Sequence, residues 1–101
     1  MTDFATSIER LQNRVRHWEQ ARWWTHKAAG TRGDLVYALV QRLADLVADA
    51  ERRDRRLVPR EPDMVLPDQL GVMSDDLLAA APDPAVLSGA AAAVNETHQS
   101  L

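Results

Sequence analysis

The chain has no cysteine, and it is poor in aromatic residues, glycine and proline. Without cysteine it can form neither disulfide bonds nor sites that depend on a thiolate. Four glycines and five prolines leave little material for the tight turns of a β-sheet protein, and no stretch alternates cleanly between polar and apolar residues. Alanine, the strongest helix former, occurs 16 times among the 101 residues. These features predict an all-α fold in a single domain, residues 1–101, with one modest core.

The sequence also lacks a long apolar run. No stretch approaches the roughly 20 apolar residues that span a bilayer. The first residues do not show the charged segment followed by an apolar segment that is typical of a secretory signal. We therefore expect a cytoplasmic protein without membrane contact.

Basic residues are absent from the last two fifths of the chain. Residues 1–60 hold all 12 basic residues and eight acidic ones, for a net charge of +4, whereas residues 61–101 hold seven acidic residues, for a net charge of −7. Two interpretations are open. The halves could face each other and neutralise, or either half could attract a partner of opposite charge.

Residues 35–56 carry the clearest helical pattern. Their apolar residues recur every three or four positions, which places one wide stripe along a helix. Just before this helix, Thr31 and Asp34 have the spacing of a capping box, with Asp in place of the usual Glu. Because the stripe is wide, we expect this helix to have neighbours on two sides.

Residues 4–29 predict a second long helix. Its apolar seam follows four- and three-residue steps through Phe4, Ile8, Leu11, Val15 and Trp18, and Gly30 supplies a natural end. Because the turn between the two helices is short, we expect them to pack as a long antiparallel hairpin.

The rest of the chain predicts an extended segment and two shorter helices. Three prolines, Pro59, Pro62 and Pro67, prevent a helix from crossing residues 57–66. The apolar residues of this stretch suggest that it lies against the bundle. Helices are predicted at about 67–80 and 84–98, with Pro67 and Pro84 in the first turn of each. The predicted architecture is a small helical bundle.

Residues 38–81, ALVQRLADLVADAERRDRRLVPREPDMVLPDQLGVMSDDLLAAA, resemble those of a family of small uncharacterised helical proteins from actinobacteria. The resemblance is consistent with a helical fold. It implies no activity, cofactor or site residue.

No motif of a catalytic, cofactor or metal site is present in the sequence. His17 and His26 are nine residues apart and would lie on different faces of a helix, and no glycine-rich phosphate loop or nucleophile elbow occurs. We therefore predict no catalytic residue, no cofactor, no metal and no enzyme activity.

The residues with the best prospect of binding a partner lie near the end of the first helix. Trp18 is expected in the core, but the neighbours Trp23 and Trp24 cannot point the same way on a helix. Tryptophan and arginine are enriched in the energetic centres of protein interfaces. The predicted partner-binding residues are Arg16, Arg22, Trp23, Trp24 and Lys27.

The leading functional hypothesis is a non-catalytic protein-interaction module that works through the helical hairpin. The two shorter helices could not cover the whole hairpin, so its remaining apolar surface would be buried by a partner or, at micromolar concentration, by a second copy in a homodimer. The alternative is a nucleic-acid-binding protein. It would use an arginine set consisting of Arg10, Arg14, Arg16, Arg22 and Arg52–Arg56.

Overall fold

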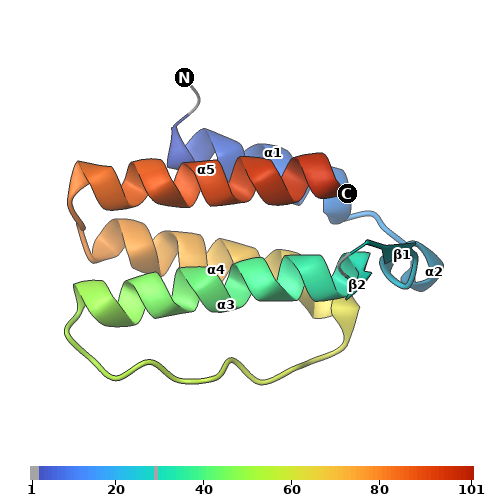
Figure 1. The fold of residues 1–101 in the computed structure, drawn as a ribbon, viewed down its shortest axis with the longest axis horizontal. Coiled ribbons are helices and arrows are strands. Elements are labelled where there is room, and N and C mark those ends of the chain that lie inside the picture. Colours follow the sequence, from blue (N-terminus) through green and yellow to red (C-terminus); the bar gives the residue numbers. More distant parts are fainter. Residues whose placement is uncertain (1–2, 29) are drawn as a thin grey trace.

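A computed structural model describes residues 3–28 and 30–101 and shows a mostly helical protein built around four helices (Figure 1). The elements, in chain order, are α1 (Phe4–Val15), α2 (Gln20–Trp23), β1 (His26–Lys27), β2 (Gly30–Thr31), α3 (Arg32–Ala50), a 3-10 turn η1 (Asp63–Val65), α4 (Leu66–Ala79) and α5 (Pro84–Ser100). The two strands pair as an antiparallel hairpin, His26 opposite Thr31. The chain is thus mostly α-helical, as predicted, apart from this very short hairpin.

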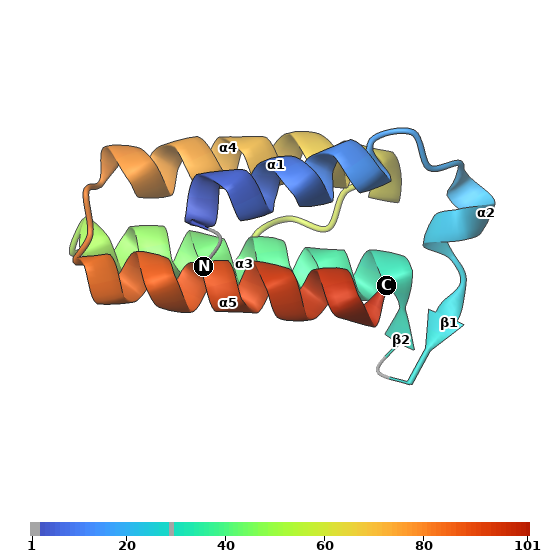
Figure 2. The same cartoon turned by 90° about the horizontal axis from the view of Figure 1, so that it is seen from above.

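The four long helices occupy the corners of a square (Figures 1 and 2). The most extensive contacts are between α3 and α4 and between α1 and α5, and each of these pairs runs in parallel. Smaller contacts join α1 to α4 and α3 to α5. Consequently α1 lies diagonally opposite α3, and α4 lies diagonally opposite α5.

The predicted long hairpin is therefore wrong in two respects. The first helix ends at Val15 and not at Ala29, a residue that itself lies outside the described part of the chain. The helices that were expected to pack together, α1 and α3, are antiparallel but occupy opposite corners of the bundle (Figure 2). The reason is that α4 and α5 fill the space between them on both sides, and both apolar stripes are buried against these two helices.

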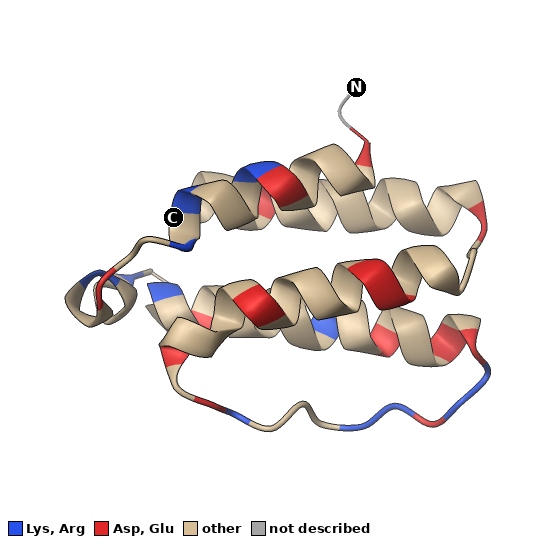
Figure 3. Cartoon of the chain, turned by 180° about the vertical axis from the view of Figure 1, so that it is seen from behind, with Lys and Arg blue, Asp and Glu red and all other residues tan. Residues whose placement is uncertain are grey.

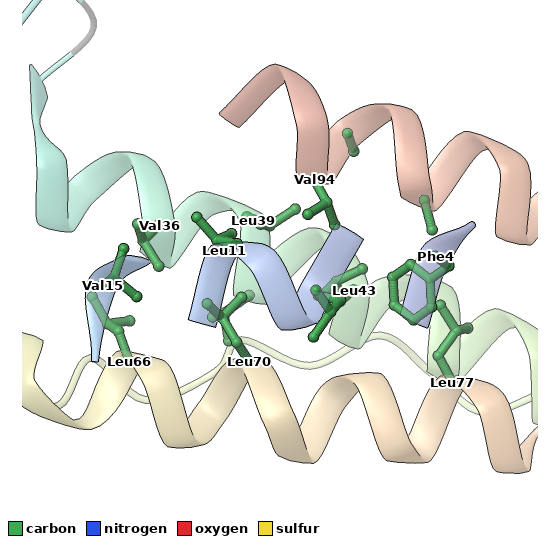
Figure 4. Close-up of a cluster of buried hydrophobic side chains, with 14 of the residues drawn as sticks. Phe4, Leu11, Val15, Val36, Leu39, Leu43, Leu66, Leu70, Leu77 and Val94 are labelled. Atoms are coloured by element: carbon green, nitrogen blue, oxygen red, sulfur yellow. The ribbon is translucent and has the colours of Figure 1, made fainter. Parts of the chain in front are cut away.

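The core lies between the four helices and takes its side chains from all of them (Figure 4). Each helix presents aliphatic residues at three- and four-residue steps, so its buried stripe faces inward. The side chains with no exposed surface include Leu11, Val36, Leu43, Leu70 and Val94. The stripe predicted for residues 35–56 is buried on its inner side, as the pattern indicates.

The third helix begins at a complete capping box and ends earlier than predicted. The Thr31 hydroxyl accepts a hydrogen bond from the Asp34 N–H, and the Asp34 carboxylate accepts one from the Thr31 N–H, both at 3.0 Å. At the other end, Arg52 adopts a left-handed conformation (φ 57°) and the Arg53 N–H reaches back to the Ala48 carbonyl at 2.8 Å. This arrangement closes the helix after Ala50, so the predicted end at residue 56 is wrong.

A proline-containing crossover connects the parallel helices α3 and α4. After the turn at residues 51–52, residues 53–62 run back along the bundle in extended form (Figure 1). The backbone of Val58, which is buried, is held by two side chains of α3, since its N–H donates to the Gln41 side chain at 2.8 Å and its carbonyl accepts from the Tyr37 hydroxyl. An extended segment lying against the bundle was predicted for residues 57–66, although residues 63–66 are helical.

Candidate functional site

Two tryptophans hold an appendage to one end of the bundle. This Trp-rich appendage, residues 16–28 and 30–31, contains α2 and the β-hairpin and lies beyond the end of α1 (Figures 1 and 2). Trp18 and Trp23 pack edge to face, with ring centroids 4.9 Å apart, and both belong to the hydrophobic core. Burial of two large rings fixes the appendage against the bundle, because each ring removes a large apolar area from water.

The predicted partner-binding residues differ in exposure, and they do not line one groove. Trp23 is fully buried, so its prediction as a partner-binding residue is wrong: its ring is needed in the core beside Trp18. Trp24 is 63% exposed. Arg16, Arg22 and Lys27 are exposed as well, but none of them lines the groove beside Trp24.

The Trp24 groove has a volume of about 420 Å³ and lies between α2, the start of α3 and the end of the crossover. Trp24 and Pro62 supply its apolar surface. Its charged lining is mostly acidic: three carboxylates and one guanidinium, which gives a net charge of −2. The lining residues are Gln20, Trp24, Thr31, Asp34, Arg60, Glu61, Pro62 and Asp63.

A hydrogen-bonded cluster gives this groove a fixed floor. The buried Asp63 accepts hydrogen bonds from Arg60 at 2.9 Å and from Gln20 of α2 at 3.1 Å. Arg60 also donates to the Gly33 carbonyl at 3.3 Å, and its guanidinium lies 4.7 Å from the centroid of the Tyr37 ring. These contacts join α2, α3 and the crossover, so the three elements that line the Trp24 groove are held together.

Asp34 remains ionised at the rim of the groove. Its pKa lies below the usual value, mainly because its carboxylate accepts the Thr31 N–H and further because of the charges of Arg60 and His26. Asp34 therefore contributes a negative charge to the groove at neutral pH.

A second groove, of about 560 Å³, lies on another side of α2 and has the opposite character. Trp18 and Ala21 line it together with three basic side chains, His17, Arg22 and Arg32. It also contains Thr25 and one carboxylate, that of Glu19.

The arginine set of the nucleic-acid hypothesis is divided between two ends of the molecule. Arg14 and Arg22 both approach the Trp18 ring, at 5.9 and 5.8 Å from its centroid. Arg52–Arg56 begin beyond the far end of α3 and run back along the crossover as far as Gln41 in the middle of that helix (Figure 3). Arg55 forms a bidentate ion pair with Asp49. The predicted basic set thus does not share one face.

In residues 3–28 and 30–101, no group of three metal-ligating side chains comes together, and no helix is both long and apolar enough to cross a bilayer. The sequence matches no family model, no curated protein and no solved structure. The resemblance of residues 38–81 to actinobacterial helical proteins stays a prediction.

Proposed function

We propose that this chain is a non-catalytic protein-interaction module whose partner surface is the Trp24 groove. The observation that carries the proposal is the exposure of Trp24, at 63%, on a support that the buried Trp18–Trp23 pair and the Asp63 cluster hold in place. A large exposed aromatic ring on a fixed base can bury its area against a partner at little cost in conformational entropy.

The charge of the groove favours a partner that inserts a basic side chain. Asp34 and Glu61 line the groove together with Trp24, and the net charge of the lining is −2. A lysine or arginine of the partner could pack on the Trp24 ring and approach these carboxylates at the same time.

The helical hairpin leaves little apolar surface for self-association. The short α1 is covered by α4 and α5, so the apolar surface that a second copy would cover is smaller than expected. A second copy would instead reach the Trp24 groove with its own exposed basic side chains, among them Lys27.

The test places a photo-reactive amino acid at position 24 in the host cell, with position 57 as the matched control. Leu57 is also a large exposed residue, at 80%, but lies on the crossover away from the groove. We expect a discrete cross-linked product from position 24 only. A product of twice the chain mass identifies a second copy, and a heavier or lighter one a different protein.

Affinity for the captured partner should fall when Trp24 is truncated. For Trp24→Ala we expect a loss of about 2 kcal/mol or more, roughly 30-fold in Kd, and for Leu57→Ala a change within about twofold. Equal cross-linking from both positions, or equal affinity of both variants, would contradict the proposal.

A further inference from the structure

Three guanidinium groups gather around one tryptophan ring on the basic side of the appendage. The guanidinium carbons of Arg14, Arg22 and Arg32 lie 5.9, 5.8 and 5.5 Å from the centroid of the Trp18 ring. They come from α1, α2 and α3, so the fold brings together cations that are well separated in the sequence. We propose that this Trp18–arginine cluster, with His17 at its edge, binds a phosphate or pyrophosphate group, free or carried by a small organic molecule.

The Trp18–arginine cluster has guanidinium N–H donors that form no hydrogen bond within the described residues. In the described part of the chain, none of the three guanidinium groups forms an ion pair with an Asp or Glu side chain. Arg14 donates to the carbonyl of His98 at 3.0 Å, and Arg32 donates to a main-chain oxygen of Leu101, the last residue of the sequence, at 3.1 Å. Each guanidinium has five N–H donors, so most of them stay available to a ligand.

Contacts within the protein hold the guanidinium groups of the Trp18–arginine cluster in position. Trp18 is only 5% exposed and packs edge to face against the buried Trp23, so the ring on which the guanidinium groups lie is immobile. These two main-chain contacts hold Arg14 and Arg32 against the end of α5. Arg22 forms no hydrogen bond through its side chain within the described residues, and it lines the groove of about 560 Å³ beside the ring.

Three positive charges around one ring repel each other, and a bound anion would offset that repulsion. The surroundings offer little internal compensation, because Glu19 is the one carboxylate in the groove lining. Arg14 lines the next groove together with Arg10 and His98, and the lining of that groove contains no carboxylate. His98 responds to this positive surrounding: its pKa lies below the usual value, first because of burial and then because of Arg14 and Arg10.

The chemistry and size of the site favour a small phosphorylated ligand over a nucleic acid. Planar guanidinium groups bind phosphate oxygens through paired N–H donors. A nucleic acid would need a longer basic track and a stacking surface. Here the Trp18 ring is buried, and the arginines of residues 52–56 lie on the crossover that starts at the opposite end of α3 (Figure 3).

The experiment is a calorimetric titration at low salt with inorganic pyrophosphate, repeated with adenosine diphosphate and with a single-stranded oligonucleotide. The test variant is Arg22→Gln, chosen because the side chain forms no hydrogen bond whose loss would disturb the fold. The control is Arg42→Gln, which removes the same charge from an exposed position on α3. Thermal melts verify that both variants fold.

We expect saturable binding of pyrophosphate at one site per chain, weakened at least about fivefold by Arg22→Gln and less than twofold by Arg42→Gln. If adenosine diphosphate binds more tightly than pyrophosphate, the ligand of the site is a phosphorylated organic molecule. If pyrophosphate binds more tightly, the ligand is a free anion.

Three results would overturn the proposal: no saturable binding of either small anion, equal weakening by both variants, or binding of the oligonucleotide alone. The last would assign the arginines to a nucleic-acid backbone. The site is independent of the Trp24 groove, so Trp24→Ala should leave pyrophosphate affinity unchanged.

Discussion

The same substitution, glycine to alanine, should have opposite effects at two helical positions of this protein. Gly89 lies inside α5, and a Cβ atom there would meet nothing within 4 Å. Gly33 lies in the first turn of α3, where a Cβ atom would be 2.6 Å from an oxygen of Asp63. Substitution at Gly89 therefore changes only the helix propensity, whereas substitution at Gly33 must move a buried carboxylate.

The magnitudes follow from the contacts that each site makes. Alanine in place of Gly89 should stabilise the fold by about 0.8 to 1 kcal/mol, the difference in helix propensity. At Gly33, the carboxylate of Asp63 is held at 2.9 Å by Arg60 and at 3.1 Å by Gln20, and hydrogen bonds of charged groups contribute about 1.5 to 3 kcal/mol each. Because both bonds would be stretched and the gain in propensity is small at a helix start, we expect a net loss of about 2 kcal/mol.

Thermal and urea unfolding of both variants test this reasoning. For a domain of this size, 1 kcal/mol corresponds to about 4 to 8 °C in Tm. Gly89→Ala should thus raise Tm by roughly 3 to 8 °C, and Gly33→Ala should lower it by roughly 8 to 16 °C. A double-mutant cycle identifies the cause, since Gly33→Ala should cost almost nothing when Asp63→Ala has already removed the carboxylate. The reasoning is refuted if Gly33→Ala raises Tm, or if it destabilises the Asp63→Ala protein as much as the wild type.

Two further predictions concern the ends of α3 and α5. Thr31→Ala removes the hydroxyl that caps α3 and should lower the free energy of unfolding by about 1 kcal/mol in urea, with Thr31→Ser close to wild type; no difference between the two would contradict the cap. The folded-state pKa of His98 is lowered by burial and by two arginines, so the unfolded chain binds its proton at a higher pH than the folded protein does. The contribution of His98 to the free energy of unfolding is therefore complete above the ordinary histidine pKa of about 6.5. It is lost as the pH decreases from there through the lowered pKa of the folded state. His98→Gln should flatten this part of the stability curve, and identical curves for the two proteins would count against it.

The helices that end at strong local signals could be predicted from the sequence. Thr31 and Asp34 form the capping box that their spacing indicates, and Pro84 begins α5 as its position predicts. Such signals act within one turn of the chain, so their physical chemistry is present in a short stretch of sequence. The end of α3 could not be predicted as easily, because it depends on a left-handed backbone conformation at Arg52. Residues other than glycine and asparagine rarely adopt this conformation.

The pairing of the helices could not be predicted in the same way. A short turn fixes the distance between two helix ends, but the apolar stripes decide which helices lie side by side. Here α1 and α3 are joined by residues 16–31 and not by a five-residue turn, and this longer connection reaches the diagonal corner. The division of charge between residues 1–60 and 61–101 likewise does not predict which elements pack together. In the described part of the chain, Arg60–Asp63 is the single ion pair between these two halves.

The break after α1 shows why tertiary packing overrides the local pattern. In a continuous helix, Trp18 and Trp23 would be separated by about 140° around the axis, so only one of the two rings could face the core. In the structure the helix stops at Val15, and both rings are buried in contact with each other. A tryptophan buries about 150 to 250 Å², which at roughly 25 cal/mol per Å² is worth about 4 to 6 kcal/mol. The break removes a few helical hydrogen bonds, each of which contributes roughly 1 kcal/mol. The free energy gained by burying the second tryptophan exceeds their sum. The same break turns Trp24 outward, so the one exposed tryptophan follows from the burial of the other two.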